Sequence, residues 1–169
     1  MPKIFAGTSQ IKNIYVGTSR IKKVWVGTSL VYSAEQWILG NGVDNLGTGN
    51  KNATYGGHGN DGSANLTKTS TAVKVASDSL YAEYCLAQWP INVSLSDYTK
   101  LHCTVSSSGS GSRFVQIDSS TTAKSTKTSG SVELNISSLT GTGHYIRLYY
   151  DCSSTGGPAS YQVSNIWME

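Results

Sequence analysis

Side chains that could bind a ligand gather in a stretch of the sequence rich in glycine and asparagine, residues 40–65. An aromatic ring can stack on the apolar face of a sugar, and amide, carboxylate and imidazole groups can bind its hydroxyls. These residue types predict a carbohydrate-binding surface, although ordinary solvated turn chemistry explains the same composition. The candidate ligand-binding residues are Tyr55, His58, Asn60, Asp61 and, near a predicted strand end, Trp89.

The sequence offers no comparable pattern for catalysis or for metal binding. It contains no nucleophile elbow, phosphate-binding loop, dinucleotide fingerprint or zinc-binding helix motif. His102 and His144 lie in predicted strands, where a packed or surface imidazole is the simpler interpretation. Glycoside hydrolysis needs two carboxylates flanking the bond, and no acid here stands in an informative context. We therefore predict a non-enzyme without metal or cofactor, with a small hydrolase that brings a cryptic carboxylate pair together as an alternative.

The three cysteines form no C-x-x-C pair. Cys103 alternates with Leu101 and Val105, which predicts a small buried apolar residue in a strand. A disulfide between Cys85 and either Cys103 or Cys152 stays open.

Composition favours an all-β protein. Only 14% of the residues are charged, and turn-forming glycine is frequent at 18 residues. No apolar run approaches the ~20 residues that span a bilayer. The start, MPKIFAGTSQ, lacks the apolar core of a signal peptide. We expect neither membrane insertion nor ordinary export.

The first 33 residues repeat with a period of ten, as IFAGTSQIKN, IYVGTSRIKK and VWVGTSLVYS. Each unit places β-branched and aromatic residues on both sides of Gly-Thr-Ser, which predicts strand, turn and strand in a β-meander of roughly four strands. Three-residue loops would pair aromatic with β-branched residues across the strands, on one common face, and this pattern favours them. Two-residue Gly-Thr loops, for which glycine at the first loop position argues, would place Tyr15 opposite Arg20 instead. The assembly surface predicted from the three-residue loops comprises Phe5, Ile11, Tyr15, Ile21, Trp25 and Val31.

Both faces of this small sheet would be largely apolar, so we expect residues 1–33 to pack on the main domain, on copies of the same chain or on another protein. The segment carries five cations and no acid, which leaves residues 34–169 with a net charge of −2. A basic ribbon with aromatic rings could bind nucleic acid. Lysines on sheets more often protect edges, so nucleic acid is disfavoured as a partner.

The remainder of the chain, residues 34–169, predicts a jelly-roll β-sandwich, because short alternating segments are separated by Ser/Gly turns. Residues 40–65 are predicted to be surface loops, and Trp37 and Trp167 are expected in the core beside apolar neighbours. The predicted strands are 71–77, 80–87, 100–106, 113–118, 131–136, 144–151 and 160–168.

Two parts of the sequence resemble known families. LSDYTKLHCTV (95–105), VELNISSLTGTGHYIRLYY (132–150) and VSNIWME (163–169) resemble the strands of jelly-roll, galactose-binding-like and carbohydrate-binding modules. IYVGTSRIKKVWVGTSLVY resembles N-terminal repeats of small tail or baseplate proteins from phages and prophages of Gram-positive bacteria. Such modules sometimes hold a structural calcium ion, but no motif here fixes one.

Together the resemblances imply a tail-associated structural and receptor-binding protein that recognises a cell-surface glycan. Its partners would be other tail proteins or copies of itself as an oligomer, in the virion tail or, before assembly, in the host cytoplasm. A free-standing carbohydrate-binding module is the alternative that needs only residues 34–169.

Overall fold

The computed structural model describes the chain in two compact units, residues 1–36 with Glu169 and residues 37–168. Within these units the described residues are 5–6, 9–10, 14–17, 19–21, 23–26, 29–33, 35–56, 64–77, 83–96, 98–151 and 158–169. In this described part the secondary structure is β throughout, and none of it forms an apolar helix long enough to cross a membrane.

The decapeptide repeats form hairpins. Each described pair of strands makes a two-stranded sheet of its own, in place of the continuous meander that the sequence predicted. The pairs are β1 (Phe5–Ala6) with β2 (Ser9–Gln10), β3 (Ile14–Val16) with β4 (Ser19–Ile21), and β5 (Lys23–Val26) with β6 (Ser29–Ser33).

The predicted three-residue loops are wrong. Val16 pairs with Ser19, so the loop has two residues, and Tyr15 faces Arg20 where Ile21 was expected. The reason lies in Gly17, whose φ of 61° suits the first position of a two-residue hairpin turn. Glycine adopts this conformation without steric cost, and that preference outweighs cross-strand pairs worth ~0.2–1 kcal/mol each.

The other two hairpins depart from the predicted register in the same way. Phe5 pairs with Gln10 and Trp25 with Leu30, so neither faces its expected partner. Ile11 lies outside the described residues. The aromatic to β-branched pairs on which the predicted assembly surface was built therefore do not form.

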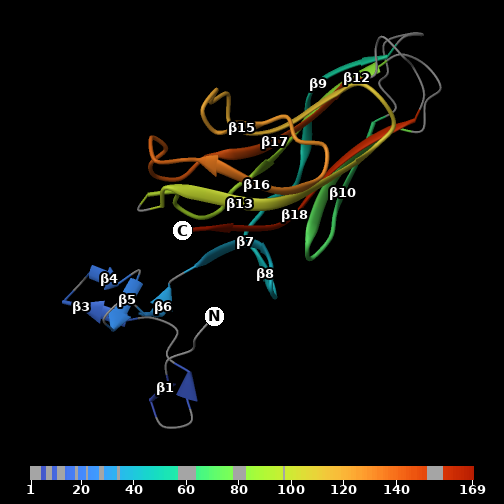
Figure 1. Cartoon of the computed structure of the whole chain (residues 1–169). Helices are drawn as coiled ribbons and strands as arrows, with labels where there is room; N and C mark the ends of the chain where they lie inside the picture. The colour runs from blue at the N-terminus through green and yellow to red at the C-terminus, as the bar shows by residue number, and fades with distance from the viewer. Residues whose placement is uncertain are drawn as a thin grey trace. The chain divides into compact units, whose positions relative to one another are not determined.

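The second unit is a sandwich of two antiparallel sheets (Figure 1). The five-stranded sheet has the order β15 (Lys124–Ser125), β14 (Ser112–Ile117), β17 (Tyr145–Asp151), β12 (Glu83–Pro90) and β9 (Asn50–Gly56). The seven-stranded sheet runs β10 (Asn65–Lys68), β11 (Ala72–Ser77), β18 (Ala159–Met168), β13 (Lys100–Ser108) and β16 (Gly130–Asn135). Its other two strands are β7 (Gln36–Gly40), which pairs with β18, and β8 (Val43–Asp44).

Successive strands cross between the sheets, since β12, β14 and β17 belong to one and β13, β16 and β18 to the other. This alternation is that of a jelly roll. It confirms the predicted all-β class and the β-sandwich. The prediction of loops over residues 40–65 is wrong in part, because β9 lies there as a polar strand at the edge of its sheet.

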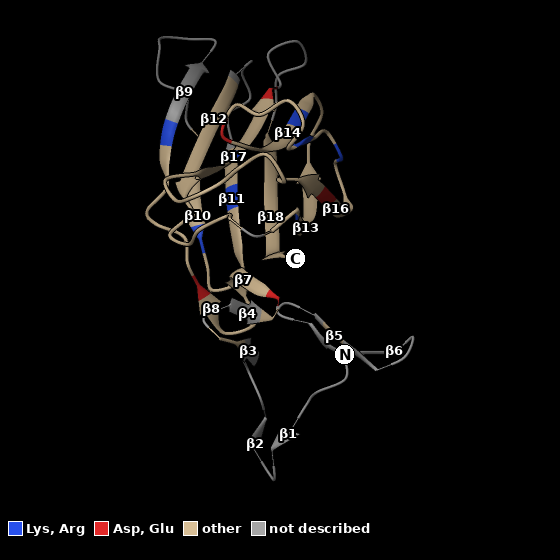
Figure 2. Cartoon of the chain, turned by 90° about the vertical axis from the view of Figure 1, so that its left-hand side faces the viewer, with Lys and Arg blue, Asp and Glu red and all other residues tan. Residues whose placement is uncertain are grey.

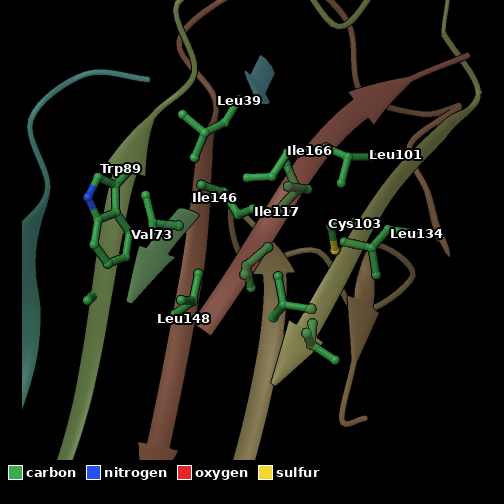
Figure 3. Close-up of a cluster of buried hydrophobic side chains, with 14 of the residues drawn as sticks. Leu39, Val73, Trp89, Leu101, Cys103, Ile117, Leu134, Ile146, Leu148 and Ile166 are labelled. Carbon is green, nitrogen blue, oxygen red and sulfur yellow. The ribbon is translucent and has the colours of Figure 1, made fainter. Parts of the chain in front are cut away.

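The core lies between the two sheets and follows the period of two expected of strands. On β13, Leu101, Cys103 and Val105 are buried, while the residues between them are more exposed. Figure 3 shows such side chains meeting from both sheets, and a fully buried Leu, Ile or Val contributes about 1.5–3 kcal/mol. Burial raises the pKa of the Cys103 thiol to about 12, so this cysteine is a neutral packing residue, as predicted.

The expected core positions of Trp37 and Trp167 are wrong, since both side chains are partly exposed, and for Trp167 a β-bulge is the reason. Thr104 pairs with Ser164 and His102 with Trp167, so β18 carries one extra residue. Asn165 sits in this bulge with a φ of 52°. The extra residue turns Trp167 to the outer face, where its ring stacks on His102 at 4.0 Å and lies 6.4 Å from that of Trp37.

A buried guanidinium fixes the turn between β13 and β14. Arg113 is 4% exposed and donates hydrogen bonds to the carbonyl oxygens of Ser108, Ser110, Gly111 and Ser160. Charged groups are otherwise sparse along the strands of the sandwich (Figure 2). The four carbonyl oxygens that bond Arg113 replace the water that its buried guanidinium has lost, which makes burial of this charge tolerable.

Candidate functional site

The loop cluster predicted from the sequence is described only in part. Tyr55 belongs to β9, where its backbone pairs with that of Tyr84 in β12. His58, Asn60 and Asp61 lie outside the described residues. A ligand-binding role for this cluster stays a prediction.

Trp89 lies in the core. Its side chain is 1% exposed and packs among residues that include Val73, Ile146 and Leu148 (Figure 3). This position does not fit the ligand-binding role expected from the sequence, because a ring enclosed on all sides offers no face to a sugar. The parity of β12 explains it, since Cys85 and Ala87 are buried at the same spacing of two.

The alternation that buries Trp89 turns other side chains of the five-stranded sheet outward. They come from β14, β17 and β12, which are neighbours in that order. Most are partly exposed, and they fall into two rows that cross the strands. We call this surface the aromatic–amide face; its members are Phe114, Tyr149, Tyr84, Gln116, Arg147 and Gln88.

The first row is aromatic. Phe114 pairs with Tyr149, and their rings stack with centroids 4.7 Å apart and planes 16° apart. On the other side, in β12, Leu86 is the strand partner of Tyr149, and Tyr84 is its diagonal neighbour, with ring centroids 6.2 Å apart. The ammonium of Lys124, from β15, lies 4.0 Å from the Phe114 ring centre. Both faces of the Phe114 ring are therefore covered in this arrangement, and Lys124 is held there by a cation–π contact of about 0.5–1 kcal/mol.

The hydroxyl of Tyr149 is oriented by an acid. It donates a hydrogen bond to Asp151 Oδ2 at 3.0 Å. Burial, together with this bond and the nearby negative charge, raises the pKa of Tyr149 above its ordinary value. The phenol therefore stays protonated at physiological pH.

The second row consists of two amides around a guanidinium. Gln116 and Gln88 both pair with Arg147, one from each side. The amide of Gln116 donates to the carbonyl of Ser120 at 2.7 Å, and Arg147 Nη1 donates to Ser119 Oγ at 2.7 Å. Gln88 Oε1 and Arg147 Nε are buried and have no hydrogen-bond partner.

Unpartnered buried polar atoms are rare in folded proteins and cost roughly 1–3 kcal/mol each. Here one acceptor and one donor occur at paired positions of adjacent strands, beside the aromatic row. Such a surface can bind a molecule that combines an apolar face with groups able to donate and accept hydrogen bonds.

A separate polar cluster stabilises one end of β17. Asp118 Oδ1 accepts the backbone N–H of Tyr145 at 2.8 Å, and Oδ2 lies 2.6 Å from His144 Nδ1. His144 Nε2 lies 3.0 Å from the carbonyl oxygen of Thr140. Since both neighbours are acceptors, the doubly protonated imidazolium fits best.

Burial lowers the pKa of His144, but the bonds to Asp118 and Thr140 and the charge of Asp118 outweigh it, so the net pKa is raised. A histidine held in this way is occupied on both nitrogens and is ill suited to abstract a proton from a substrate. Among the described residues, no three His, Cys, Asp or Glu side chains gather as metal ligands.

Sequence reasoning missed the aromatic–amide face. All of its residues except Gln88, which is one position beyond the predicted strand 80–87, were within predicted strands, at the positions that alternate with the core. The available signal was the polar and aromatic character of these outward positions, as in Arg147 and Tyr149 between the buried Ile146, Leu148 and Tyr150. Pairing of strands distant in the sequence, which assembles the rows, has no local signal.

Comparisons with known proteins found solved structures that are similar to this chain. No family model matches the chain, and no curated protein matches it. A family 11 carbohydrate-binding module of the cellulosomal cellulase Lic26A-Cel5E of Clostridium thermocellum has a TM-score of 0.45 and 17% identity, covering 79% of this chain and 93% of that one.

Two further structures are similar at about the same level. A low-affinity xylan-binding module, CBM86, from Roseburia intestinalis has a TM-score of 0.43 and 12% identity, covering 80% of this chain and 92% of its own. A family 29 carbohydrate-binding module complexed with mannohexaose has a TM-score of 0.41 and 11% identity, covering 79% and 89%. Similarity at this level identifies neither a ligand nor a function for this chain.

Proposed function

We propose that this protein is a non-catalytic carbohydrate-binding protein and that the aromatic–amide face is its ligand-binding surface. The observation that supports the proposal is the pair of buried, unpartnered atoms, Gln88 Oε1 and Arg147 Nε, beside a row of aromatic rings. A sugar presents apolar C–H groups together with hydroxyls that both donate and accept hydrogen bonds. It can therefore satisfy the amide row while contacting the aromatic row.

Displacement of Lys124 would complete the surface. Its contact with Phe114 is weak, because cation–π pairs at exposed sites contribute only about 0.5–1 kcal/mol. A sugar ring, comparable in area to the Phe114 ring, can take the place of the Lys124 ammonium on the face of that ring. Lys124 can then turn to solvent. Tyr149, fixed by Asp151, keeps its position during this exchange.

The experiment compares Gln88→Met with Gln162→Met by isothermal titration against a panel of soluble neutral and acidic polysaccharides. Both glutamines are outward-facing and partly exposed, but Gln162 lies on β18 of the other sheet. Loss of one hydrogen bond of about 1 kcal/mol should weaken binding roughly fivefold for Gln88→Met and leave Gln162→Met unchanged. A wild-type protein that binds no member of the panel, or equal losses in the two variants, would refute the proposal.

The predicted loop site is tested in the same assay. Tyr55→Ala and Asp61→Ala should leave binding unchanged if the aromatic–amide face is the site. If these two variants lose binding while Gln88→Met keeps it, the loop is the ligand-binding surface and the face is not.

The tail-associated role remains a separate proposal, and its support is the decapeptide repeat. In that role residues 1–33 attach the glycan-binding sandwich to other tail proteins or to copies of the same chain. The free-standing carbohydrate-binding module requires no such attachment. A gene neighbourhood of tail genes, and detection of the protein in purified virions, would support attachment; a neighbourhood of polysaccharide-degrading enzymes would contradict it.

A further inference from the structure

Arg147 is a partly buried cation with an incomplete set of partners. Nη1 donates to Ser119 Oγ, whereas Nε is buried without a partner. Among the described residues, the ion pairs join other groups: Lys68 with Asp44, Lys100 with Glu133, and Asp118 with His144. The side chain is partly exposed, so the cost falls on the single shielded N–H, and within the described part of the chain no acceptor satisfies it.

No carboxylate of the described residues bonds Arg147, since Asp118, which precedes Ser119, is engaged by His144 and by the backbone N–H of Tyr145. Gln116 and Gln88 flank it on the adjacent strands, and both are neutral. Asp151 lies four residues further along β17, roughly 13 Å away at the rise of a strand. Lys124 adds a second cation over Phe114. The face thus carries two cations, Arg147 and Lys124, with one carboxylate, that of Asp151, bonded to the hydroxyl of Tyr149.

The orientation of the guanidinium selects the shape of anion that it can bind. Because Nη1 is engaged by Ser119, the edge formed by Nε and Nη2 is the part left to bind a ligand. That edge carries two parallel N–H groups, which match the two oxygens of a carboxylate. Nε is shielded from water, so an entering carboxylate must displace a neighbouring side chain to reach it.

We infer that the glycan bound by this face is acidic and that Arg147 binds a carboxylate on one of its sugars. This inference rests on the proposed function and names the ligand class of the same surface. Gln88, beside Arg147, would bond a hydroxyl of that sugar. The aromatic row would contact its neighbour in the glycan chain.

The test uses the full-length protein and matched ligands. Polygalacturonate, alginate and hyaluronan are each titrated beside their methyl-esterified forms, which keep the backbone but lose the charge, and beside neutral polysaccharides. Titrations at about 0.1 M and about 1 M salt, where the Debye length falls from about 10 Å to about 3 Å, report the electrostatic part of binding. Dextran sulfate serves as a polyanion without carboxylates.

Three variants separate the effect on binding of the two parallel N–H groups of the guanidinium, its fork, from the effect of its charge alone. Arg147→Lys keeps the charge and removes the fork, Arg147→Met removes both, and Lys74→Met removes one charge from β11 of the other sheet. Far-ultraviolet circular dichroism establishes that each variant is folded. We expect esterification and Arg147→Lys each to weaken binding about tenfold or more, with Lys74→Met within about twofold of wild type.

The possible results are distinct. Binding to at least one acidic polymer that is lost on esterification, on Arg147→Lys and at high salt supports the inference. Equal binding to acidic and esterified forms, binding to neutral polymers only, full binding by Arg147→Lys, or equal binding to dextran sulfate overturns it and leaves glycan binding in place. Binding to no polysaccharide overturns the proposed function as well.

Discussion

Adding one methyl group at Gly49 should destabilise the sandwich, because that group would overlap a rigid ring in the core. A Cβ built on Gly49 lies 2.5 Å from Cε2 of Trp89 and also overlaps Nε1. Trp89 is 1% exposed, so its indole has no space into which to move. The backbone of the loop before β9 must shift instead.

The expected cost of Gly49→Ala is that of overpacking, about 1–3 kcal/mol. With a urea m-value of about 2 kcal/mol/M, a loss of 2 kcal/mol lowers the unfolding midpoint by about 1 M. Gly47→Ala is the matched control, since its Cβ would lie 3.0 Å from Cγ of Pro90, close but without comparable overlap. Its cost should be less than half that of Gly49→Ala.

Urea unfolding followed by circular dichroism measures both variants, and a double-mutant cycle with Trp89→Leu identifies the cause. Leucine has no atoms beyond Cδ and so removes the overlapping Nε1 and Cε2, and Gly49→Ala in the Trp89→Leu background should cost at least about 1 kcal/mol less than in the wild type. A neutral Gly49→Ala, or a cost that is unchanged in the Trp89→Leu background, would show that the overlap does not limit stability.

Three further predictions concern parts of the chain outside the glycan site. Because the pKa of His144 is raised in the folded state, its contribution to stability should be complete below the unfolded value of ~6.5 and be lost as pH rises through the folded pKa. The urea midpoints of wild type and His144→Asn should therefore converge with rising pH. A gap that grows with pH would contradict the Asp118–His144 bond. Arg113→Met should cost on the order of 3 kcal/mol in the same assay, because it leaves buried carbonyls without a donor, and a cost under 1 kcal/mol would argue against their burial. Deleting residues 1–33 should change either the oligomeric state by light scattering or the melting temperature, and no change in both would refute an assembly or packing role for the repeats.

The strands of the sandwich were largely predictable because their signal is local. Alternation of Leu101, Cys103 and Val105 placed one strand at 100–106, and β13 runs from Lys100 to Ser108. The hairpin loops were predicted wrongly because the weight was given to side-chain pairs, whereas the positive φ of Gly17 decides the turn. Strand β9 was missed because a polar strand at a sheet edge has the composition of a loop.

The candidate site could not be predicted in the same way. Gln88 and Arg147 are far apart in the sequence, and they meet only because β12 pairs with β17 in one particular register. A shift of one residue would exchange the inner and outer faces of either strand. The ring of Trp89 shows the same dependence, since its identity suggested a ligand-binding aromatic while its parity with Cys85 and Ala87 places it in the core.

The bulge at Asn165 makes the last strand sensitive to mutation by deletion as well as by substitution. On the far side of the bulge Ile166 and Met168 are buried and Trp167 is outward. An in-frame loss of the single codon for Asn165 would change no other residue, yet it would reverse the parity of all three and bring two apolar side chains to the surface. Such deletions should be rarer at this codon than in the turns of the same gene, even though Asn165 itself is exposed and polar.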